Sequence, residues 1–411
     1  MSFTLSLTIL VIIFLLVEFY FLKRTKNSLL NTFPEFKTGL FNKLFTAFCV
    51  FINIYPVILI IYWSYIMIFG GGRNAGIEST LYDYLLVYPF WAFVMIVTQS
   101  LIFILPVDLI RLVLYLIFRN RREKIFSIVS KIFTVLIILT VIYVPARIIY
   151  DYNTVETRIS KTYINNLPED LEGFRIALVA DTQADRYTDK ARLDNFIEKV
   201  NNTNPDLVLV AGDIITSTPD YINIAAEELG KIKSKNGIYA CYGDHDNWAY
   251  REDLLRSQKE IREALNNNGI PIYNNENKIL RFGSAKVKIT FATYTYSTRI
   301  SAEEINALAE NNSANDLNIF LIHQPSEAIV KIAGEKGYDL FFSGHTHGGQ
   351  ITLLFPFVRL SPTLLETQYV RGDYFYDDMK IVVTPGLGMS IAPIRYNSTP
   401  EVTVIELHNK N

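Results

Sequence analysis

The sequence predicts an N-terminal four-helix transmembrane region, residues 1–150, followed by an α/β domain, residues 151–411. Residues before about 150 are mostly apolar, whereas short β-rich runs alternate with amphipathic stretches after it, as is typical of an α/β fold. The chain carries 39 Lys and Arg against 41 Asp and Glu, a formal charge of −2. It therefore has no overall basic field for a nucleic acid, and we expect no nucleic-acid partner.

Four N-terminal segments are long enough to cross a bilayer, which takes roughly 20 apolar residues. They lie near Phe3–Leu22, Leu44–Gly70, Tyr84–Val107 and Ile125–Ala146. The only charged residues within them are Glu18 and Lys131. Soluble core helices of such length and apolarity are rare, so we expect a multi-pass integral membrane protein whose partner is the lipid bilayer.

The basic residues of the connecting loops predict the orientation, because cytoplasmic loops are enriched in Lys and Arg. The first loop holds Lys23, Arg24, Lys26, Lys37 and Lys43, the third holds Arg111, Arg119, Arg121, Arg122 and Lys124, and the second holds only Arg73. This distribution predicts that loops one and three lie on the cytoplasmic side of the membrane. Four crossings place the α/β domain on the outer face of the cell membrane.

Polar residues follow the predicted strands of the α/β domain. The predicted strands are Arg175–Ala180, Leu207–Ala211, Ile238–Tyr242, Val287–Tyr294, Asn318–Ile322 and Leu340–Phe342; the predicted helices are Asp189–Asn202, Tyr221–Ser234, Tyr250–Asn268, Ala302–Glu310 and Ser326–Glu335. Ligands of open α/β sheets bind outside the carboxyl ends of the strands. We therefore expect these polar residues to converge on one site.

The residues at the strand ends are those of a metal site. Asp181-Thr182-Gln183, Gly212-Asp213, Gly243-Asp244-His245-Asp246, Ile322-His323-Gln324 and Gly344-His345-Thr346-His347 follow five of the strands, and they include four of the five histidines. Two histidines two residues apart can address two neighbouring metals. The two cysteines, Cys49 and Cys241, lie far apart in apolar runs, which excludes a thiolate site.

These motifs, in this order, resemble those of the calcineurin-like metallophosphoesterase superfamily, from Phe174 to about Gln350. Further segments resemble its membrane-associated bacterial branch, which is similar to UDP-2,3-diacylglucosamine pyrophosphatase: Thr384-Pro385-Gly386-Leu387-Gly388, Pro393-Ile394-Arg395 and Pro400-Glu401. The resemblance implies a four-layer αββα sandwich and two divalent metal ions. They would activate a water for in-line attack on phosphorus.

The resemblance also implies a role for each site residue. Asp181, Asp213 and His347 would hold the first metal, and Asp213, His323 and His345 the second, with Asp213 bridging and Asp244 completing the second. His245 would stay outside the metal sphere as the catalytic residue that gives a proton to the leaving group.

Three positions depart from the family pattern. Gln183 replaces a histidine ligand, Asp244 replaces an asparagine, and Thr216 stands where a second acid is common. The amide oxygen of glutamine is a harder donor than imidazole, so we expect Mn²⁺, with Mg²⁺, Fe²⁺ and Zn²⁺ as alternatives.

The sequence thus predicts a membrane-anchored phosphoesterase that hydrolyses a phosphodiester or a pyrophosphate. The substrate is a small molecule or is linked to a lipid or an envelope polymer. The alternative is a non-catalytic sensor or transport-associated membrane protein that binds metal and a phosphorylated ligand.

Overall fold

The computed structural model describes residues 3–69, 79–310, 315–355 and 358–410. The chain divides into two compact units. The helical unit comprises Met1–Ile149 and Leu353–Leu360, and the α/β unit comprises Tyr150–Thr352 and Ser361–Asn411.

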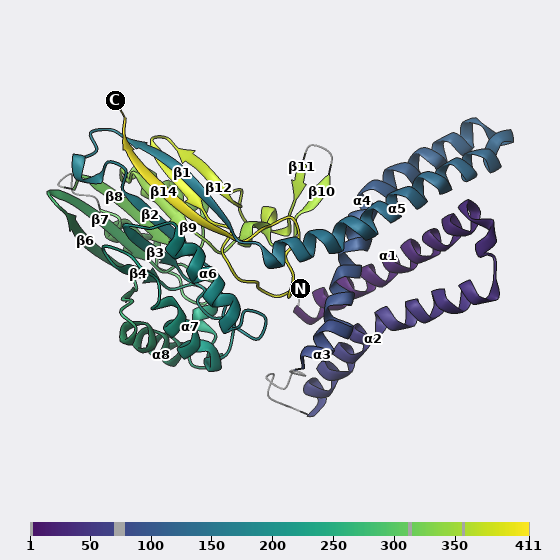
Figure 1. Ribbon diagram of the computed structural model, residues 1–411, viewed down its shortest axis with the longest axis horizontal. Helices are drawn as coiled ribbons and strands as arrows, with labels where there is room; N and C mark the ends of the chain where they lie inside the picture. Colours follow the sequence, from purple (N-terminus) through teal and green to yellow (C-terminus); the bar gives the residue numbers. More distant parts are fainter. Residues whose placement is uncertain (1–2, 70–78, 311–314, 356–357, 411) are drawn as a thin grey trace. The chain divides into compact units, whose positions relative to one another are not determined.

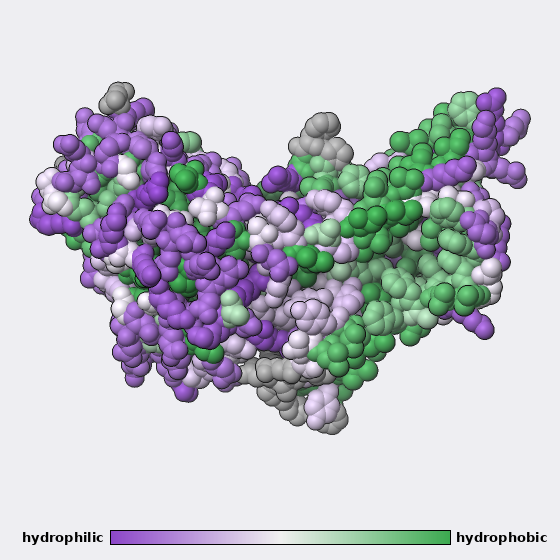
Figure 2. All heavy atoms as spheres, viewed as in Figure 1, coloured by the Kyte–Doolittle hydropathy of each residue, from purple (hydrophilic) through white to green (hydrophobic). Residues whose placement is uncertain are grey.

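The helical unit is built from long apolar helices (Figure 1). They are α1 (Phe3–Thr32), α2 (Gly39–Phe69), α3 (Thr80–Tyr82), the π-helical η2 (Asp83–Val87), α4 (Tyr88–Ile117) and α5 (Arg122–Asn153), with the short turns η1 (Pro34–Phe36) and η3 (Arg119–Arg121). Three stretches of the described chain are long and apolar enough to span a membrane: Gly39–Ile66, Thr80–Ile117 and Arg119–Asn153. Figure 2 shows hydrophobic side chains gathered over these helices. The first predicted segment forms α1 but is not among the three, so the fourth span stays a prediction.

Two buried carboxylates of the helical unit accept hydrogen bonds from side chains of other helices. Asp108 on α4 accepts hydrogen bonds from the guanidinium of Arg24 on α1, 2.9 Å away, and from the hydroxyl of Tyr20, 2.6 Å away. Glu18 accepts a hydrogen bond of 2.8 Å from Asn53 on α2. Such pairing is required because an unpaired charge is costly among apolar helices.

A hairpin also belongs to the helical unit, although it comes from the second half of the chain. Its strands are β10 (Leu353–Phe355) and β11 (Val358–Leu360). The side chain of Gln99 on α4 makes two hydrogen bonds with the backbone of Leu354, one at each end of its amide. The domain boundary predicted near residue 150 does not anticipate this return of the chain.

The α/β unit contains two six-stranded sheets. The first has the order β1 (Glu156–Ile164), β14 (Glu401–Asn409), β2 (Arg175–Val179), β3 (Leu207–Ala211), β4 (Ile238–Cys241), β5 (Ile272–Tyr273); the second has β12 (Gly372–Tyr376), β13 (Met379–Val383), β9 (Leu340–Ser343), β8 (Leu317–Ile322), β7 (Ala285–Ala292), β6 (Glu276–Phe282). The pairs β2–β3, β3–β4, β7–β8 and β8–β9 are parallel. The residues that follow these strands therefore gather at one edge of each sheet.

Three apolar cores hold the α/β unit together. Alternate residues of β2 point to opposite faces, as in any strand. Ala177 and Val179 pack with residues of α6 (Lys190–Asn202), α7 (Ile222–Leu229) and α8 (Leu254–Asn267). Ile176 and Leu178 pack in a second core with residues of β7, β8 and β9. The third core joins the second sheet to α9 (Ala302–Leu308) and α10 (Glu327–Glu335).

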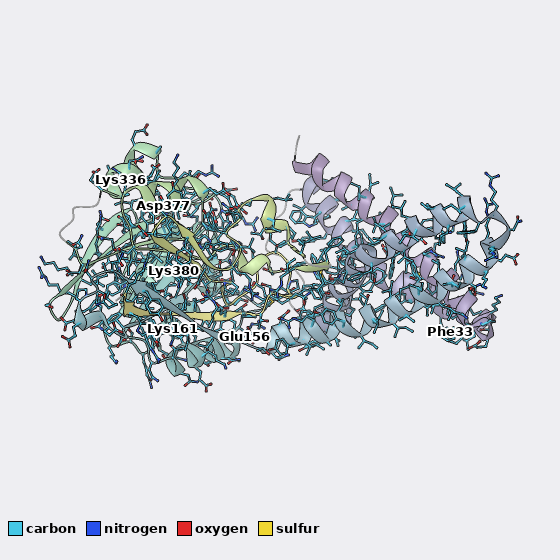
Figure 3. The ribbon with its side chains drawn as sticks, turned by 90° about the horizontal axis from the view of Figure 1, so that it is seen from above. Phe33, Glu156, Lys161, Lys336, Asp377 and Lys380 are labelled. Atoms are coloured by element: carbon cyan, nitrogen blue, oxygen red, sulfur yellow. The ribbon has the colours of Figure 1, made fainter. Side chains whose placement is uncertain are left out.

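Polar contacts connect β1 of the first sheet to β12 and β13 of the second. The ammonium of Lys380 on β13 donates to the backbone oxygen of Lys161 on β1, 2.8 Å away, and both residues are labelled in Figure 3. Asp373 on β12 pairs with Lys380 at 3.0 Å and with Arg158 at 2.6 Å. These contacts fix the two sheets at the edge that carries β1.

Candidate metal centre

All eight predicted site residues lie in loops after β2, β3, β4, β8 and β9. Asp181 and Gln183 follow β2, Asp213 follows β3, Asp244 and His245 follow β4, His323 follows β8, and His345 and His347 follow β9. Backbone hydrogen bonds join the loops: the Gln183 nitrogen donates to the Asp213 oxygen, and the Gly344 nitrogen to the His323 oxygen, at 3.0 and 3.1 Å. Parallel pairing thus brings the loops of each sheet together, and the hydrogen bond of 3.0 Å from the His345 nitrogen to Asp181 Oδ2 joins the loops of the two sheets.

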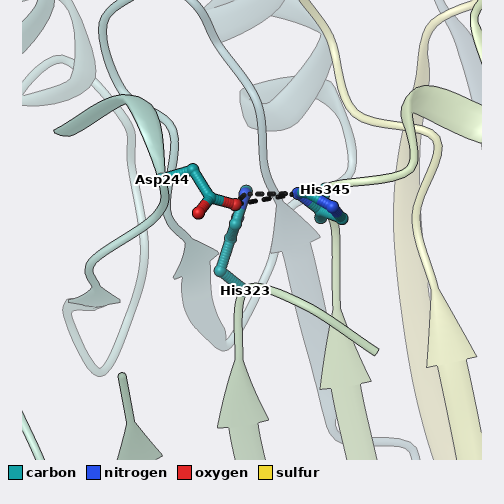
Figure 4. Close-up of side chains that lie close together, drawn as sticks. All are labelled: Asp244, His323 and His345. Atoms are coloured by element: carbon teal, nitrogen blue, oxygen red, sulfur yellow. Dashed lines mark hydrogen bonds and ion pairs between the residues drawn. The ribbon is translucent and has the colours of Figure 1, made fainter. Parts of the chain in front are cut away.

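Two overlapping groups of side chains could each hold a metal ion. One is Asp181, Asp213 and His323, and the other is Asp244, His323 and His345; the candidate ligand atoms of each group lie within 4.8 Å of one another. His323 Nε2 lies 3.2 Å from Asp213 Oδ2, and His345 Nδ1 lies 3.1 Å from Asp244 Oδ2. Figure 4 shows Asp244, His323 and His345 pointing at one another. The donors are nitrogen and oxygen, which suit divalent metals such as Mn²⁺.

Gln183 supplies an oxygen that no other group uses. Its side chain is fully buried, and its Nε2 donates to Asp213 Oδ2 at 2.7 Å. Its Oε1 is buried and finds no hydrogen-bond partner among the described residues. Buried polar atoms are almost always paired, so this orphan acceptor, on a side chain that contacts the Asp213 carboxylate, fits a cation.

His347 faces Asp181 because Arg395 holds its other side. Nε2 of His347 lies 3.5 Å from Asp181 Oδ1. The fully buried guanidinium of Arg395 donates to the His347 backbone oxygen and lies 3.4 Å from His347 Nδ1. Burial, reinforced by Arg395, lowers the pKa of His347 well below its usual value. The ring is therefore neutral, as a metal ligand must be.

His345 is oriented by two residues that sequence reasoning missed. Glu366 Oε1 lies 3.0 Å from His345 Nε2, and the hydroxyl of Tyr296 donates to the same carboxylate at 2.6 Å. A carboxylate on the outer nitrogen leaves the inner one free to bind a metal. Both residues come from loops without a motif, so no signal in the sequence marks them.

His245 contacts neither group through its ring. Its Nδ1 lies against the backbone oxygen of Thr216, and its Nε2 lies 3.1 Å from the hydroxyl of Ser390. The ring of Trp248 packs edge-on against it, with 4.7 Å between ring centres. His245 is thus beside the carboxylate site, held at a fixed tautomer by a carbonyl oxygen.

The loops of the site adopt a backbone conformation that most residues avoid. The angle φ is positive at Asp181, Gln183, Asp213, His345 and His347, with values of 53°, 48°, 56°, 71° and 49°. Such residues cost free energy and cluster at functional sites. Asp246 offsets part of this cost, because its carboxylate accepts hydrogen bonds from the backbone nitrogens of Asp213, Ile214 and Gly243.

The electrostatics of the site favour added positive charge. Burial raises the pKa of Asp181 to about 6. Burial opposes the protonation of His345, but hydrogen bonds to Asp244 and Glu366 raise its pKa to about 9. The pKa of His323 is well above its usual value, because Asp213 outweighs the burial. Protons on the His323 and His345 rings thus supply positive charge that bound metal ions would otherwise supply.

Comparison with known proteins is consistent with this geometry. Residues 174–349 match the model of the calcineurin-like phosphoesterase family. These residues form a calcineurin-like phosphoesterase domain. Such a domain indicates a phosphoester-hydrolysing enzyme that uses divalent metal ions.

Relatives carry the same description. The uncharacterized metallophosphoesterase YkuE of Bacillus subtilis is 28% identical over 60% of this chain and 82% of its own length. The uncharacterized metallophosphoesterase Cj0846 of Campylobacter jejuni is 27% identical over 90% of this chain and 93% of its own. A transmembrane protein with metallophosphoesterase domain from Danio rerio is 30% identical over 59% of this chain and 55% of its own. The similarity to the Campylobacter protein thus includes the apolar helices.

Proposed function

We propose that the protein is a membrane-anchored phosphoesterase that hydrolyses a phosphodiester or a pyrophosphate with two divalent metal ions, Mn²⁺ foremost. The observation that carries this proposal is the orphan oxygen of Gln183 beside two overlapping groups of ligand atoms. Buried acceptors without a partner are uncommon, and this one belongs to a side chain that contacts a candidate metal ligand, Asp213.

Each side chain has a proposed place. Asp181, Gln183, Asp213 and His347 hold the first ion, and Asp213, Asp244, His323 and His345 the second, with Asp213 common to both. Bound ions would supply a water nucleophile at neutral pH and neutralise the charge of the phosphoryl oxygens. Glu366 keeps the imidazole of His345 in its ligating orientation.

His245 is the proposed acid. Its Nδ1 is fixed by the Thr216 carbonyl oxygen, so Nε2, now beside Ser390, is the atom that can give a proton to the leaving-group oxygen. A positioned acid of this kind contributes roughly 10²–10⁴-fold to a rate.

The rest of the chain supports a location at a membrane. The apolar helices support anchoring of the enzyme, and the basic loops support an α/β unit on the outer face. We further propose the four-layer αββα arrangement, which the three apolar cores support.

Hydrolysis assays test the proposal. Detergent-solubilised protein is assayed with Mn²⁺ against bis-p-nitrophenyl phosphate and p-nitrophenyl phosphate, with Asp213→Asn as the matched inactive control. We expect turnover of the diester that chelation abolishes. Binding of Mn²⁺ and phosphate without turnover under any divalent metal would favour the sensor and contradict the enzyme.

A cysteine at Lys259 tests the orientation. This residue lies on α8 with its side chain 73% exposed. The native Cys241 is buried, and Cys49 is exchanged for serine. We expect Lys259→Cys to react with an impermeant maleimide in intact cells whose envelope admits the reagent. Labelling only after the membrane is opened would place the α/β unit inside.

A further inference from the structure

Two apolar side chains beside the candidate metal centre are almost wholly exposed. Leu365 is 95% exposed and Ile391 is 97% exposed, whereas no other large hydrophobic residue in the described part of the chain exceeds 79%. Single exposed apolar residues are normal on protein surfaces. These two are set apart by where they lie.

Each of the two directly adjoins a residue of the site. Leu365 precedes Glu366, whose carboxylate contacts His345, and its other neighbour, Leu364, is also exposed. Ile391 follows Ser390, whose hydroxyl contacts His245. The apolar side chains therefore flank both the metal-ligand side and the proposed acid side of the site.

The backbone at Ile391 is strained in a way that presents this side chain. Its φ is 64°, a left-handed conformation that is an outlier for a β-branched residue. Asn or Gly would adopt this conformation with less strain. An isoleucine at this position carries two costs, the left-handed backbone and the exposure of its apolar side chain to water. An apolar environment around the side chain would remove the second cost.

The same segment of chain carries the hairpin of the helical unit. Five residues, 348–352, link His347 to Leu353, and five residues, 361–365, link Leu360 to Glu366. Links of that length reach about 20 Å at most. The hairpin itself exposes Phe355 and Val358. Exposed apolar side chains therefore occur along the chain from the hairpin of the helical unit to the loops of the site. The helices of that unit are long enough to span a membrane.

We propose that Leu364, Leu365 and Ile391 form an apolar lip that inserts into the interface of the lipid bilayer, so that the site takes the phosphoester of an amphiphilic lipid at headgroup level. The inference rests on the proposed function and names its substrate class. Tyr296, which is half-exposed and contacts Glu366, adds the amphipathic aromatic ring that favours membrane interfaces.

Depth-dependent quenching tests the lip in the full chain. Cysteines replace Leu365, Ile391 or Lys259 one at a time in the Cys49→Ser protein, and each is labelled with an environment-sensitive fluorophore. The proteins are reconstituted in phosphatidylcholine vesicles with or without phosphatidylcholine that is spin-labelled on its acyl chain. We expect quenching at positions 365 and 391 from a depth of about 5–10 Å, and none at position 259.

The possible outcomes distinguish failure of the proposed lip from failure of the proposed enzymatic activity. Quenching at 365 and 391 no stronger than at 259 would overturn the lip, even if the protein hydrolyses bis-p-nitrophenyl phosphate. Quenching without any hydrolysis would leave the lip standing and remove the proposed function. Efficient disulfide cross-linking between two copies through Leu365→Cys, without quenching, would show that a second copy covers the surface and would also overturn the lip. In the protein labelled at 391, Leu365→Glu should reduce the quenching if the lip inserts as one surface.

Discussion

Replacing Gln183 by glutamate tests the orphan oxygen through charge alone. The exchange keeps the size of the side chain but puts a carboxylate oxygen where Nε2 now donates to Asp213 Oδ2, 2.7 Å away. Both side chains are buried. Two unit charges at that distance repel by about 6 kcal/mol at an effective dielectric constant of about 20.

Proton uptake limits this penalty. The repulsion raises the folded-state pKa of the introduced glutamate to above about 8, from about 4.3 in the unfolded chain. The metal-free variant then loses stability as pH rises above about 4.3, by about 1.4 kcal/mol per pH unit, which gives about 1 kcal/mol at pH 5 and about 4 kcal/mol at pH 7. Bound metal replaces the proton and reverses the loss.

Thermal unfolding at pH 5 and pH 7, in chelator or in Mn²⁺, measures the effect. In chelator, Gln183→Glu should unfold well below the wild type at pH 7 and close to it at pH 5, and Mn²⁺ should restore it. The neutral variant Gln183→Met should show a cost that does not depend on pH. The reasoning is refuted if Gln183→Glu in chelator unfolds at the wild-type temperature at pH 7, or if Mn²⁺ stabilises it no more than it stabilises Gln183→Met.

Four further predictions concern the site and its lip. Asp213→Ala should lose bound metal and all turnover, whereas His245→Ala should keep its metal and lose roughly 10²–10⁴-fold in rate; metal analysis showing loss in His245→Ala would contradict its place outside the metal sphere. Because the pKa of metal-free His345 is about 9 and a ligand imidazole must be neutral, Mn²⁺ binding should release protons and tighten as pH rises from 6 to 9; equal calorimetric heats in buffers of different ionisation enthalpy would argue against this. Asp244→Asn removes one negative charge, so titrations should show weaker binding of the second metal and a lower KM for an anionic substrate; unchanged values would mean that Asp244 does not face the ion. Ile391→Asn should raise stability by about 1 kcal/mol by relieving the left-handed backbone; a lower Tm would show that the isoleucine side chain packs on the protein itself.

The part of the site that sequence analysis could predict is the part attached to strand ends. Asp181 and Asp213 could be placed together because each follows a short apolar run, and neighbouring parallel strands end at a common edge of their sheet. His323 follows β8 of the second sheet, so this rule alone does not bring it to them. Glu366 and Tyr296 could not, because nothing in the local sequence ties either residue to His345. Whether the predicted ligands bind metal stays a prediction.

For the fold as well, some elements could be predicted from the local sequence and others were missed. The predicted strand Leu207–Ala211 and the predicted helix Asp189–Asn202 agree with β3 and with α6, for which Asp189 is the N-cap. The sequence analysis predicts neither β1 nor β14. The two strands lie almost the whole α/β unit apart in sequence, and β1 exposes much of one face, so β1 carries a weak local signal. β14 is almost wholly buried and rich in β-branched residues, a local signal that the sequence analysis missed.

The position of β14 affects how the protein is made. This last strand lies between β1 and β2, parallel to the former and antiparallel to the latter. The first sheet therefore cannot close until about residue 409 has left the ribosome, long after the apolar helices have been synthesised. A nascent chain that stops short of β14 should therefore leave both flanking strands, β1 and β2, exposed to proteolysis.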